Sequence, residues 1–297
     1  MEKTKMASQS SPANQGSNHI HPIHQLSILR IAPKFIGVVH LQALPGDARA
    51  TTSSFDSCYQ QALADAQALI DGGVEGIIVE NFGSAPFNKG TQVDPAPAHQ
   101  VAALTVVASQ IRALAPHIKI GINCLRNDAL AALGIASAVK ADFIRVNILS
   151  GTYVTDQGVI EGEAARVLAY RRQLHAEHIK IFADVLVKHA SPLAPLSAEQ
   201  ACLDTWKRGG ADALIVSGTG TGAPVDESLL EQVQSVVKGG VPIYIGSGLN
   251  IDNLDRLAPL ASGAIVGTAL KEEGRLQAPV SAKRVSDMQQ ALKQHWS

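Results

Sequence analysis

The chain has 297 residues, 46% of them hydrophobic, and its 25 basic and 26 acidic residues leave a net charge of -1. This balance gives neither a basic field for nucleic acid nor an acidic tail, and no apolar run approaches the roughly 18–20 residues of a membrane span. The three cysteines, Cys58, Cys124 and Cys202, show no CxxC spacing. They predict reduced thiols, and hence a cytoplasmic protein without a transmembrane segment.

Residues 1–33 differ from the rest of the chain, because they are rich in Ser, Asn, Gln and His and offer little that a core could bury. We expect a polar, disordered N-terminal extension there, and one domain over residues 34–297. His19, His21 and His24 would suit a metal, but free tails often carry scattered histidines with no role. The sequence therefore predicts no metal site, and it identifies no cofactor.

Eight short apolar segments recur along the domain, and a helix-length segment follows each of them. Runs of Ile, Val and Leu are typical of parallel strands that helices cover on both faces. Eight such units in a chain of this length predict a single α/β domain, a closed (β/α)8 TIM barrel. The predicted strands are residues 35–41, 76–81, 119–125, 143–149, 180–186, 213–218, 242–246 and 263–267.

The connections between these segments carry further signals. Glycine pairs at 72–73, 209–210 and 239–240 predict helix ends, because glycine readily takes the left-handed conformation that closes a helix. Two connections, 81–97 and 149–163, are predicted as extended loops. Long loops after barrel strands are where enzymes of this fold usually place specificity.

Polar side chains stand at the carboxyl ends of the predicted strands, the face of this fold that carries active sites. In the fourth strand Arg145 and Asn147 are two residues apart, so both are expected to point into the barrel. The catalytic candidates at this face are His40, Glu80, Arg145, Asp184 and Lys188. The candidates for lining the pocket are Asn81, Asn123, Asn147, Ser217 and Thr219.

The cationic candidates each have a structural alternative. Arg145 either stabilises negative charge on a ligand or forms a structural ion pair with Glu80 or Asp184, because an unpaired buried charge is costly. Lys188 is a Schiff-base lysine only where burial lets it lose its proton, and is otherwise a solvated loop lysine. His189, next to it, has a side chain that can act as a general base near neutral pH.

The remaining candidates also have two interpretations. His40 either moves a proton or is a buried histidine whose hydrogen bonds are satisfied. Asn123 and Asn147 either contact a ligand or hydrogen-bond within the barrel. Convergence of His40, Glu80 and Asp184 would make a divalent-metal site, but a sequence does not establish convergence.

A phosphate site is predicted after the last two strands. Gly246, Ser247 and Gly248 follow the seventh strand, and Gly267 and Thr268 follow the eighth, where barrels of this type often bind phosphate. Glycine lets backbone N–H groups approach an anion, and the helix expected after Gly248 would direct its N-terminus at the same place. The alternative is that these glycines only form tight turns. A second glycine-rich loop, 217–222, follows the sixth strand.

The strand-end sequences, taken together, resemble the BtpA family of TIM barrels. The resemblance runs in order from about residue 35 to residue 271. The segments that carry it are GVVHLQALPG (37–46), GVEGIIVENFGSAPF (73–87), GINCLRND (121–128), ADFIRVNIL (141–149), VTDQGVIEG (154–162), ADVLVKHA (183–190), GGADALIVSGTGTG (209–222) and GAIVGTALK (263–271).

This resemblance implies a barrel similar to the ribulose-phosphate-binding enzymes. Cyanobacterial members of the family are factors for photosystem I biogenesis or stability, peripheral to the thylakoid membrane, so the resemblance implies that function, with photosystem I assembly components as partners. The family also occurs in organisms without photosynthesis. The alternative function rests on the strand-end residues and the predicted phosphate site, and is an enzyme acting on a small phosphorylated metabolite bound after the seventh and eighth strands. The resemblance brings no catalytic residues with it. Oligomeric state stays open, and a homo-oligomer is one option, since such barrels often pair.

Overall fold

The computed structural model describes residues 32–50, 54–218 and 225–296. The chain divides into two units, residues 1–31 and residues 32–297, and the description below concerns the second. The predicted polar extension and Thr219 lie outside the described residues, so the prediction for the extension stays a prediction. No described helix has both the length and the apolar character needed to cross a membrane.

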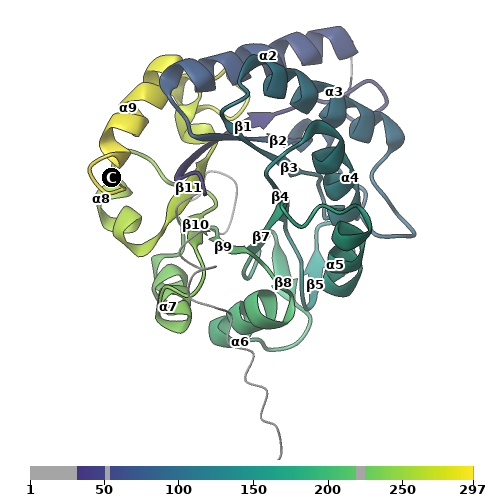
Figure 1. Cartoon of the computed structure of the whole chain (residues 1–297), viewed down its shortest axis with the longest axis vertical. Helices are drawn as coiled ribbons and strands as arrows, with labels where there is room; N and C mark the ends of the chain where they lie inside the picture. Colours follow the sequence, from purple (N-terminus) through teal and green to yellow (C-terminus); the bar gives the residue numbers. More distant parts are fainter. Residues whose placement is uncertain (1–31, 51–53, 219–224, 297) are drawn as a thin grey trace, which may run out of the picture. The chain divides into compact units, whose positions relative to one another are not determined.

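Eight parallel strands form a closed barrel in which the last strand pairs with the first, and this confirms the predicted (β/α)8 fold (Figure 1). Neighbouring strands follow the order β1-β11-β10-β9-β7-β4-β3-β2 around the barrel. Their bounds are β1 Phe35–His40, β2 Gly76–Glu80, β3 Lys119–Asn123, β4 Phe143–Val146, β7 Lys180–Asp184, β9 Ala213–Val216, β10 Ile243–Ile245 and β11 Gly263–Val266.

Helices surround the barrel and cover the outer face of the strands (Figure 1). Gly73, Gly210 and Gly239 have φ angles of 89°, 74° and 77°, which are the left-handed helix ends expected from the glycine pairs. The helices are α2 Phe55–Gly72, α3 Ala98–Leu114, α4 Ala129–Val139, α5 Ala164–Gln173, α6 Ala198–Leu203, α7 Glu227–Val237, α8 Leu254–Leu257 and α9 Ala282–Leu292. Short helical turns lie at 82–84, 204–208, 258–260, 268–270 and 272–274.

Aromatic side chains fill the interior below the mouth of the barrel. The rings of Phe143 and Phe182 stack with centroids 4.6 Å apart, and Tyr244 lies 4.8 Å from Phe182. Because side chains alternate along a strand, the next inward positions on β4 and β7 belong to Arg145 and Asp184. A charged layer therefore lies directly above an apolar one, at the carboxyl ends of the strands.

The loop predicted over 149–163 is mostly a hairpin. Strands β5 (Thr152–Thr155) and β6 (Gly158–Glu161) pair antiparallel, and β8 (Ala190–Pro192) adds a third strand to the other side of β5. The inner face packs Tyr153 and Ile160 with Val187. The prediction missed this sheet because β8 comes from a different part of the chain. The sheet anchors the segment that follows Lys188.

The helix expected directly after Gly248 is also different. It begins at Leu254 and has four residues, α8. Asn250 explains the delay, because its side-chain oxygen accepts hydrogen bonds from the backbone N–H groups of Asp252 and Asn253 and forms a turn instead. A helix this short, starting this late, brings no dipole to the predicted phosphate site.

Candidate active site

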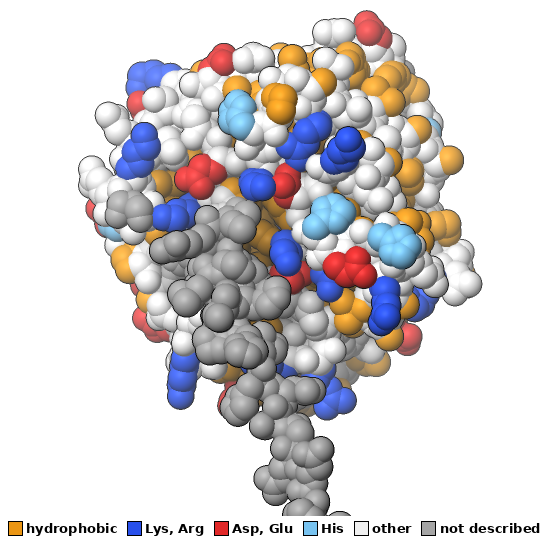
Figure 2. Space-filling model, in the orientation of Figure 1, with side chains coloured by type: hydrophobic (Ala, Val, Ile, Leu, Met, Phe, Trp, Pro, Cys, Tyr) orange, Lys and Arg blue, Asp and Glu red, His pale blue; other side chains and the backbone are white. Residues whose placement is uncertain are grey.

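Two neighbouring cavities lie at the carboxyl ends of the strands and share part of their lining. The larger has a volume of about 910 Å³ and the smaller about 500 Å³. Figure 2 shows Lys, Arg, Asp, Glu and His side chains gathering around the centre of one face of the barrel. The side chains that line both cavities are His40, Glu80, Phe82, Arg145 and Lys188. All four of the charged or titratable residues among them are predicted catalytic candidates.

Arg145 and Asp184 form the central ion pair. Arg145 donates from Nε to Oδ2 of Asp184 at 2.9 Å and from Nη2 to Oδ1 at 2.8 Å. Asn147 and Ser217 donate to the same carboxylate at 3.3 and 3.2 Å. Arg145 therefore forms the structural ion pair that was one of its two predicted roles, and its partner is Asp184 rather than Glu80. Nη1 donates to none of the described residues, so the guanidinium keeps one nitrogen for a ligand.

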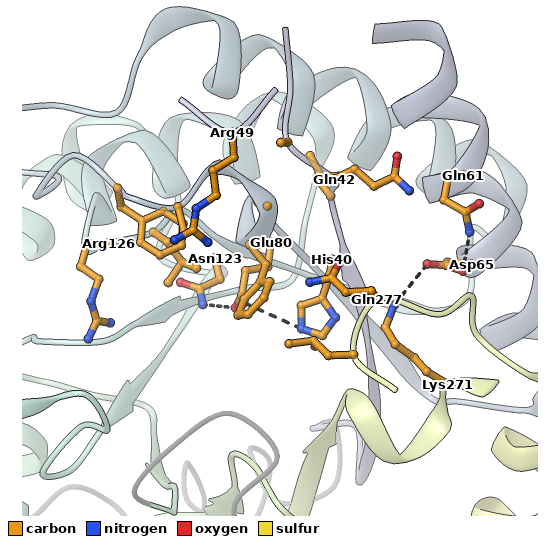
Figure 3. Close-up of a pocket in the computed structure, with 18 of the residues that line it drawn as sticks. His40, Gln42, Arg49, Gln61, Asp65, Glu80, Asn123, Arg126, Lys271 and Gln277 are labelled. Carbon is orange, nitrogen blue, oxygen red and sulfur yellow. Dashed lines mark hydrogen bonds and ion pairs between the residues drawn. The ribbon is translucent and has the colours of Figure 1, made fainter. Parts of the chain in front are cut away.

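Glu80, Asn123 and His40 form a second group in the lining of the larger cavity (Figure 3). Asn123 donates from Nδ2 to Oε2 of Glu80, and Nε2 of His40 lies 4.0 Å from Oε1 of the same carboxylate. Burial, together with the charges of Lys271, Lys188 and Arg145, lowers the pKa of His40 from 6.5 to about 3. His40 is therefore a neutral imidazole at physiological pH.

Lys188 follows β7 and lines both cavities. Its ammonium group has no hydrogen bond or ion pair among the described residues. Burial and the nearby charge of Arg145 lower the pKa of Lys188 from 10.5 to about 8. Arg126 holds this segment, donating from Nη2 to the carbonyl oxygens of Lys188 and His189 at 3.2 and 3.3 Å. Lys188 is thus placed by its backbone, while its amine stays available.

The predicted phosphate-binding residues all line the smaller cavity, namely Gly246, Ser247, Gly248, Gly267 and Thr268. Within the described part of the chain, no acceptor is found for the backbone N–H groups of Gly248 and Thr268. Ser247 accepts a hydrogen bond at Oγ from the N–H of Gly218 at 3.1 Å, which leaves its hydroxyl proton for a ligand. These groups form a candidate anion site on two adjacent strand ends.

Two of these glycines are also required by the close packing around them. A Cβ on Gly246 would lie 2.3 Å from Cγ2 of Ile215 and 2.5 Å from Oγ of Ser217. A Cβ on Gly267 would lie 2.8 Å from Cε1 of His40. Both positions therefore need glycine for close approach to the charged layer, whether or not an anion binds.

The predicted pocket-lining residues divide between the cavity and its supports. Asn123 and Asn147 line the larger cavity. Asn81 is fully buried and outside both cavities, where it binds Gln100 and the backbone of Leu125, so it supports a loop. Ser217 likewise acts through Asp184 rather than at the cavity surface.

The structure also adds residues that the sequence did not single out. Arg126 lines the larger cavity and binds Asp156 at 2.9 Å, and Arg49 projects into the same cavity (Figure 3). Lys271 and Asp65 form a buried pair 3.7 Å apart on the opposite side. In the sequence, Arg126 and Lys271 could be noticed only as charged residues that follow a strand end. Many solvated loop residues have the same property, so it does not identify a cavity residue.

No three His, Cys, Asp or Glu side chains lie close enough to hold a metal ion, as far as the described residues show. The metal alternative for His40, Glu80 and Asp184 also meets a specific obstacle. Both oxygens of Asp184 already accept hydrogen bonds from Arg145.

The fold and the site define a class of protein, a single (β/α)8 barrel with a charged cavity at the carboxyl ends of its strands. The chain belongs to the BtpA family, whose sequence model matches residues 32–294. It is 46% identical over 259 residues to the "Photosystem I biogenesis protein BtpA" of Synechocystis, covering 86% of this chain and 87% of that protein. The resemblance inferred from the strand-end sequences is thereby confirmed.

Other relatives come from distant organisms. An uncharacterized protein of Thermococcus kodakarensis is 46% identical over 259 residues, covering 87% of this chain and 95% of the relative. An uncharacterized mitochondrial protein of Caenorhabditis elegans is 32% identical over 260 residues, covering 86% and 91%. The archaeal relatives argue against a strictly photosynthetic role for the family.

Solved structures share the fold at low sequence identity. The tryptophan synthase alpha chain of Legionella pneumophila matches with a TM-score of 0.55 and 16% identity, covering 91% of this chain and 95% of that one. The 3-keto-L-gulonate-6-phosphate decarboxylase of Vibrio cholerae matches with a TM-score of 0.52 and 14% identity, covering 90% and 100%. At these identities the likeness concerns the fold alone.

Proposed function

We propose that this protein is a barrel enzyme that acts on a small phosphorylated metabolite. One observation carries the proposal: the loops after β10 and β11 line the same cavity as Arg145 and Lys188. Phosphate bound at these loops would hold the rest of the metabolite against the charged layer. This end of the barrel is also where enzymes of the fold place phosphate.

The backbone supports the phosphate part of the proposal. Gly248 has a φ of 76°, in the left-handed region where glycine is favoured, and its N–H has no acceptor among the described residues. Together with the N–H of Thr268 and the hydroxyl of Ser247, it provides donors from two adjacent strands. Such groups bind an anion without a dedicated cation.

Arg145 and Lys188 provide the charge for chemistry. Because Asp184 fixes the guanidinium, Arg145 is oriented before a ligand binds, and preorganised cations stabilise negative charge that develops during a reaction. Asp184 itself has both oxygens bound within the protein, so we assign it a positioning role. We assign proton transfer to Lys188, whose pKa of about 8 suits a group that changes charge near neutral pH. Neutral His40 would then be a hydrogen-bonding partner of the substrate.

Thermal unfolding with a panel of phosphorylated metabolites tests the proposal. A ligand at 100 times its dissociation constant stabilises the native state by about 2.7 kcal/mol, which raises the midpoint by at least about 4 °C in a chain of this size. The compound that gives the largest shift is then tested for turnover. Lys188→Met should abolish turnover, whereas exposed Lys283→Met should leave it unchanged.

Two glycine variants separate phosphate binding from backbone strain. Gly248→Asp brings a negative charge to the proposed phosphate site and should remove the ligand-induced shift. Gly239→Asp is the matched control, since Gly239 has nearly the same φ of 77° and no atom within 4 Å of an added Cβ. Loss of the shift in both variants, or in neither, would contradict the phosphate site.

A role in photosystem I biogenesis is the second candidate, and the identity to the Synechocystis protein favours it. In that role the chain would act on photosystem I assembly components from a peripheral position at the thylakoid membrane. The two functions are compatible, because lack of a metabolite can limit assembly. Expression in a cyanobacterium that lacks its own relative tests this role by photosystem I content. Restoration by wild type but not by Lys188→Met would link the role to the cavity.

A further inference from the structure

Two asparagine side chains in the larger cavity each have one polar atom without a partner among the described residues. Oδ1 of Asn123 and Oδ1 of Asn147 are buried and accept no hydrogen bond from the part of the chain that the structure describes. The two residues are only 1% and 3% exposed, and both line the cavity. Buried polar groups are almost always satisfied in native proteins, so two such atoms in one cavity call for an explanation.

A carboxylate fixes the orientation of each asparagine. Nδ2 of Asn123 donates to Oε2 of Glu80, and Nδ2 of Asn147 donates to Oδ2 of Asp184 at 3.3 Å. An ionised carboxylate only accepts hydrogen bonds, so the amide nitrogen must face it and the amide oxygen must face away. Each amide oxygen is therefore held as an acceptor that faces away from its carboxylate. Because both asparagines line the cavity, a molecule that fills it is the source of donors that we consider.

His40 adds a third acceptor. Its Nδ1 is buried and has no partner within residues 32–50, 54–218 and 225–296, while Nε2 lies 4.0 Å from Oε1 of Glu80. With the ring neutral, a proton on Nε2 is favoured by the neighbouring carboxylate, and Nδ1 then accepts.

The charge of the cavity selects the kind of donor. Amino groups of metabolites are usually protonated near neutral pH. The larger cavity is lined by five basic side chains and three acidic ones, and this excess of positive charge disfavours a cation; the basic residues are Arg49, Arg126, Arg145, Lys188 and Lys271, and the acidic ones are Asp65, Glu80 and Asp156. A hydroxyl group is a neutral donor and meets no such repulsion. The acceptors therefore favour a molecule with several hydroxyl groups.

We propose that the ligand is a polyhydroxylated phosphate ester whose hydroxyl groups donate to Oδ1 of Asn123 and Oδ1 of Asn147. This inference rests on the proposed function, since it takes the phosphate end to lie at the loops after β10 and β11. It narrows the proposed substrates to polyhydroxylated phosphate esters, because esters with an apolar or aromatic body would leave both acceptors unsatisfied.

Calorimetric titration of the full chain with two matched phosphate monoesters tests the inference. D-ribitol 5-phosphate and n-pentyl phosphate have the same number of chain carbons and the same phosphate, and differ in the hydroxyl groups. Because one hydrogen bond contributes about 1 kcal/mol and a factor of ten in affinity is about 1.4 kcal/mol, ribitol phosphate should bind at least about tenfold more tightly. Equal affinity, or tighter binding of the alkyl ester, would overturn the inference.

Asn147→Leu locates the effect at the acceptor. The variant loses one of the two hydrogen bonds, so it should bind ribitol phosphate about fivefold more weakly and leave the affinity for pentyl phosphate unchanged. The ligand comparison with wild-type protein stands alone where this variant does not fold. Binding of both esters with equal affinity refutes this inference and leaves the phosphate site intact. Binding of neither ester refutes the inference together with the phosphate site.

Discussion

Asp184 binds Arg145 through two hydrogen bonds at the centre of the barrel, and their side chains are only 0% and 5% exposed. Asn147 and Ser217 complete the hydrogen bonds of the carboxylate. Breaking such a buried pair is costly, because the remaining charge stays buried without a partner. The same ion pair therefore stabilises the barrel and fixes the position of a side chain that lines the candidate active site.

We expect Asp184→Asn to lower the free energy of unfolding by about 3–5 kcal/mol, because it leaves the Arg145 charge unpaired. Urea denaturation measures the change. Asp287→Asn is the control, since Asp287 pairs with Lys283 on the surface, where such pairs contribute less than about 1 kcal/mol. Replacing both partners, in Arg145→Met with Asp184→Leu, should recover much of the loss. A loss no larger than that of the control would show that the pair does not stabilise the barrel.

Lys188 should make the protein more stable as the pH rises toward 10. Burial lowers the pKa of Lys188 from 10.5 in the unfolded chain to about 8 in the folded one. The unfolded state therefore binds more protons between these values, and stability increases with pH across that window. Lys188→Met removes this contribution. We expect the free energy of unfolding of wild type, relative to the variant, to increase from pH 8 to pH 10.5 in urea denaturation.

A bound anion should reverse part of this shift. Negative charge beside Lys188 favours the protonated amine, so a phosphate ester in the cavity should raise its pKa. NMR titration of labelled lysine side chains, with and without ligand, measures the change, and the Lys188→Met spectrum assigns the signal. An unchanged pKa with ligand bound would place the anion away from Lys188.

The barrel was predictable because its evidence is local. Runs of apolar residues gave the strands, and the two-residue period placed Arg145 and Asn147 inside before any contact was known. The loops after the last two strands were predictable for the same reason. Contacts between distant segments were not, and the pairing of Lys271 with Asp65 and of β8 with β5 are examples.

The orientation of the asparagines was beyond sequence reasoning as well. Asn123 was a candidate from its place at a strand end, but its free oxygen depends on where Glu80 lies. The late start of α8 follows from the hydrogen bonds at Asn250, since side-chain bonds to the backbone compete with a helix that the pattern otherwise favours.

His40 should make the protein sensitive to acid. Burial lowers its pKa from 6.5 in the unfolded chain to about 3 in the folded one. Between these values the unfolded state binds the extra proton, so stability is lost as the pH falls from 6.5 toward 3. His40→Gln removes the titrating group. We expect the free energy of unfolding of wild type, relative to this variant, to fall across that window, and a constant difference would show that His40 is not held neutral.

A side chain at position 246 should destabilise the protein. A Cβ there would lie 2.3 Å from Ile215 and 2.5 Å from Ser217, and the second contact adjoins the Arg145–Asp184 pair. Overpacking of this kind typically costs about 1–3 kcal/mol. We therefore expect Gly246→Ala to lower the free energy of unfolding by that amount and to weaken binding of phosphate esters, as measured by urea denaturation and calorimetry.

Gly134 offers the matched substitution. It lies within α4, and the nearest atom to an added Cβ is Oη of Tyr170 at 3.6 Å, an ordinary contact. Alanine is favoured over glycine in a helix by roughly 0.5–1 kcal/mol, so Gly134→Ala should stabilise the protein and leave ligand affinity unchanged. The same substitution of glycine by alanine is thus expected to lower the free energy of unfolding at position 246 and to raise it at position 134, because the two positions differ in the space around Cα. Stabilisation by both substitutions would mean that the strand end after β10 can relax, and that glycine at 246 is not required for packing.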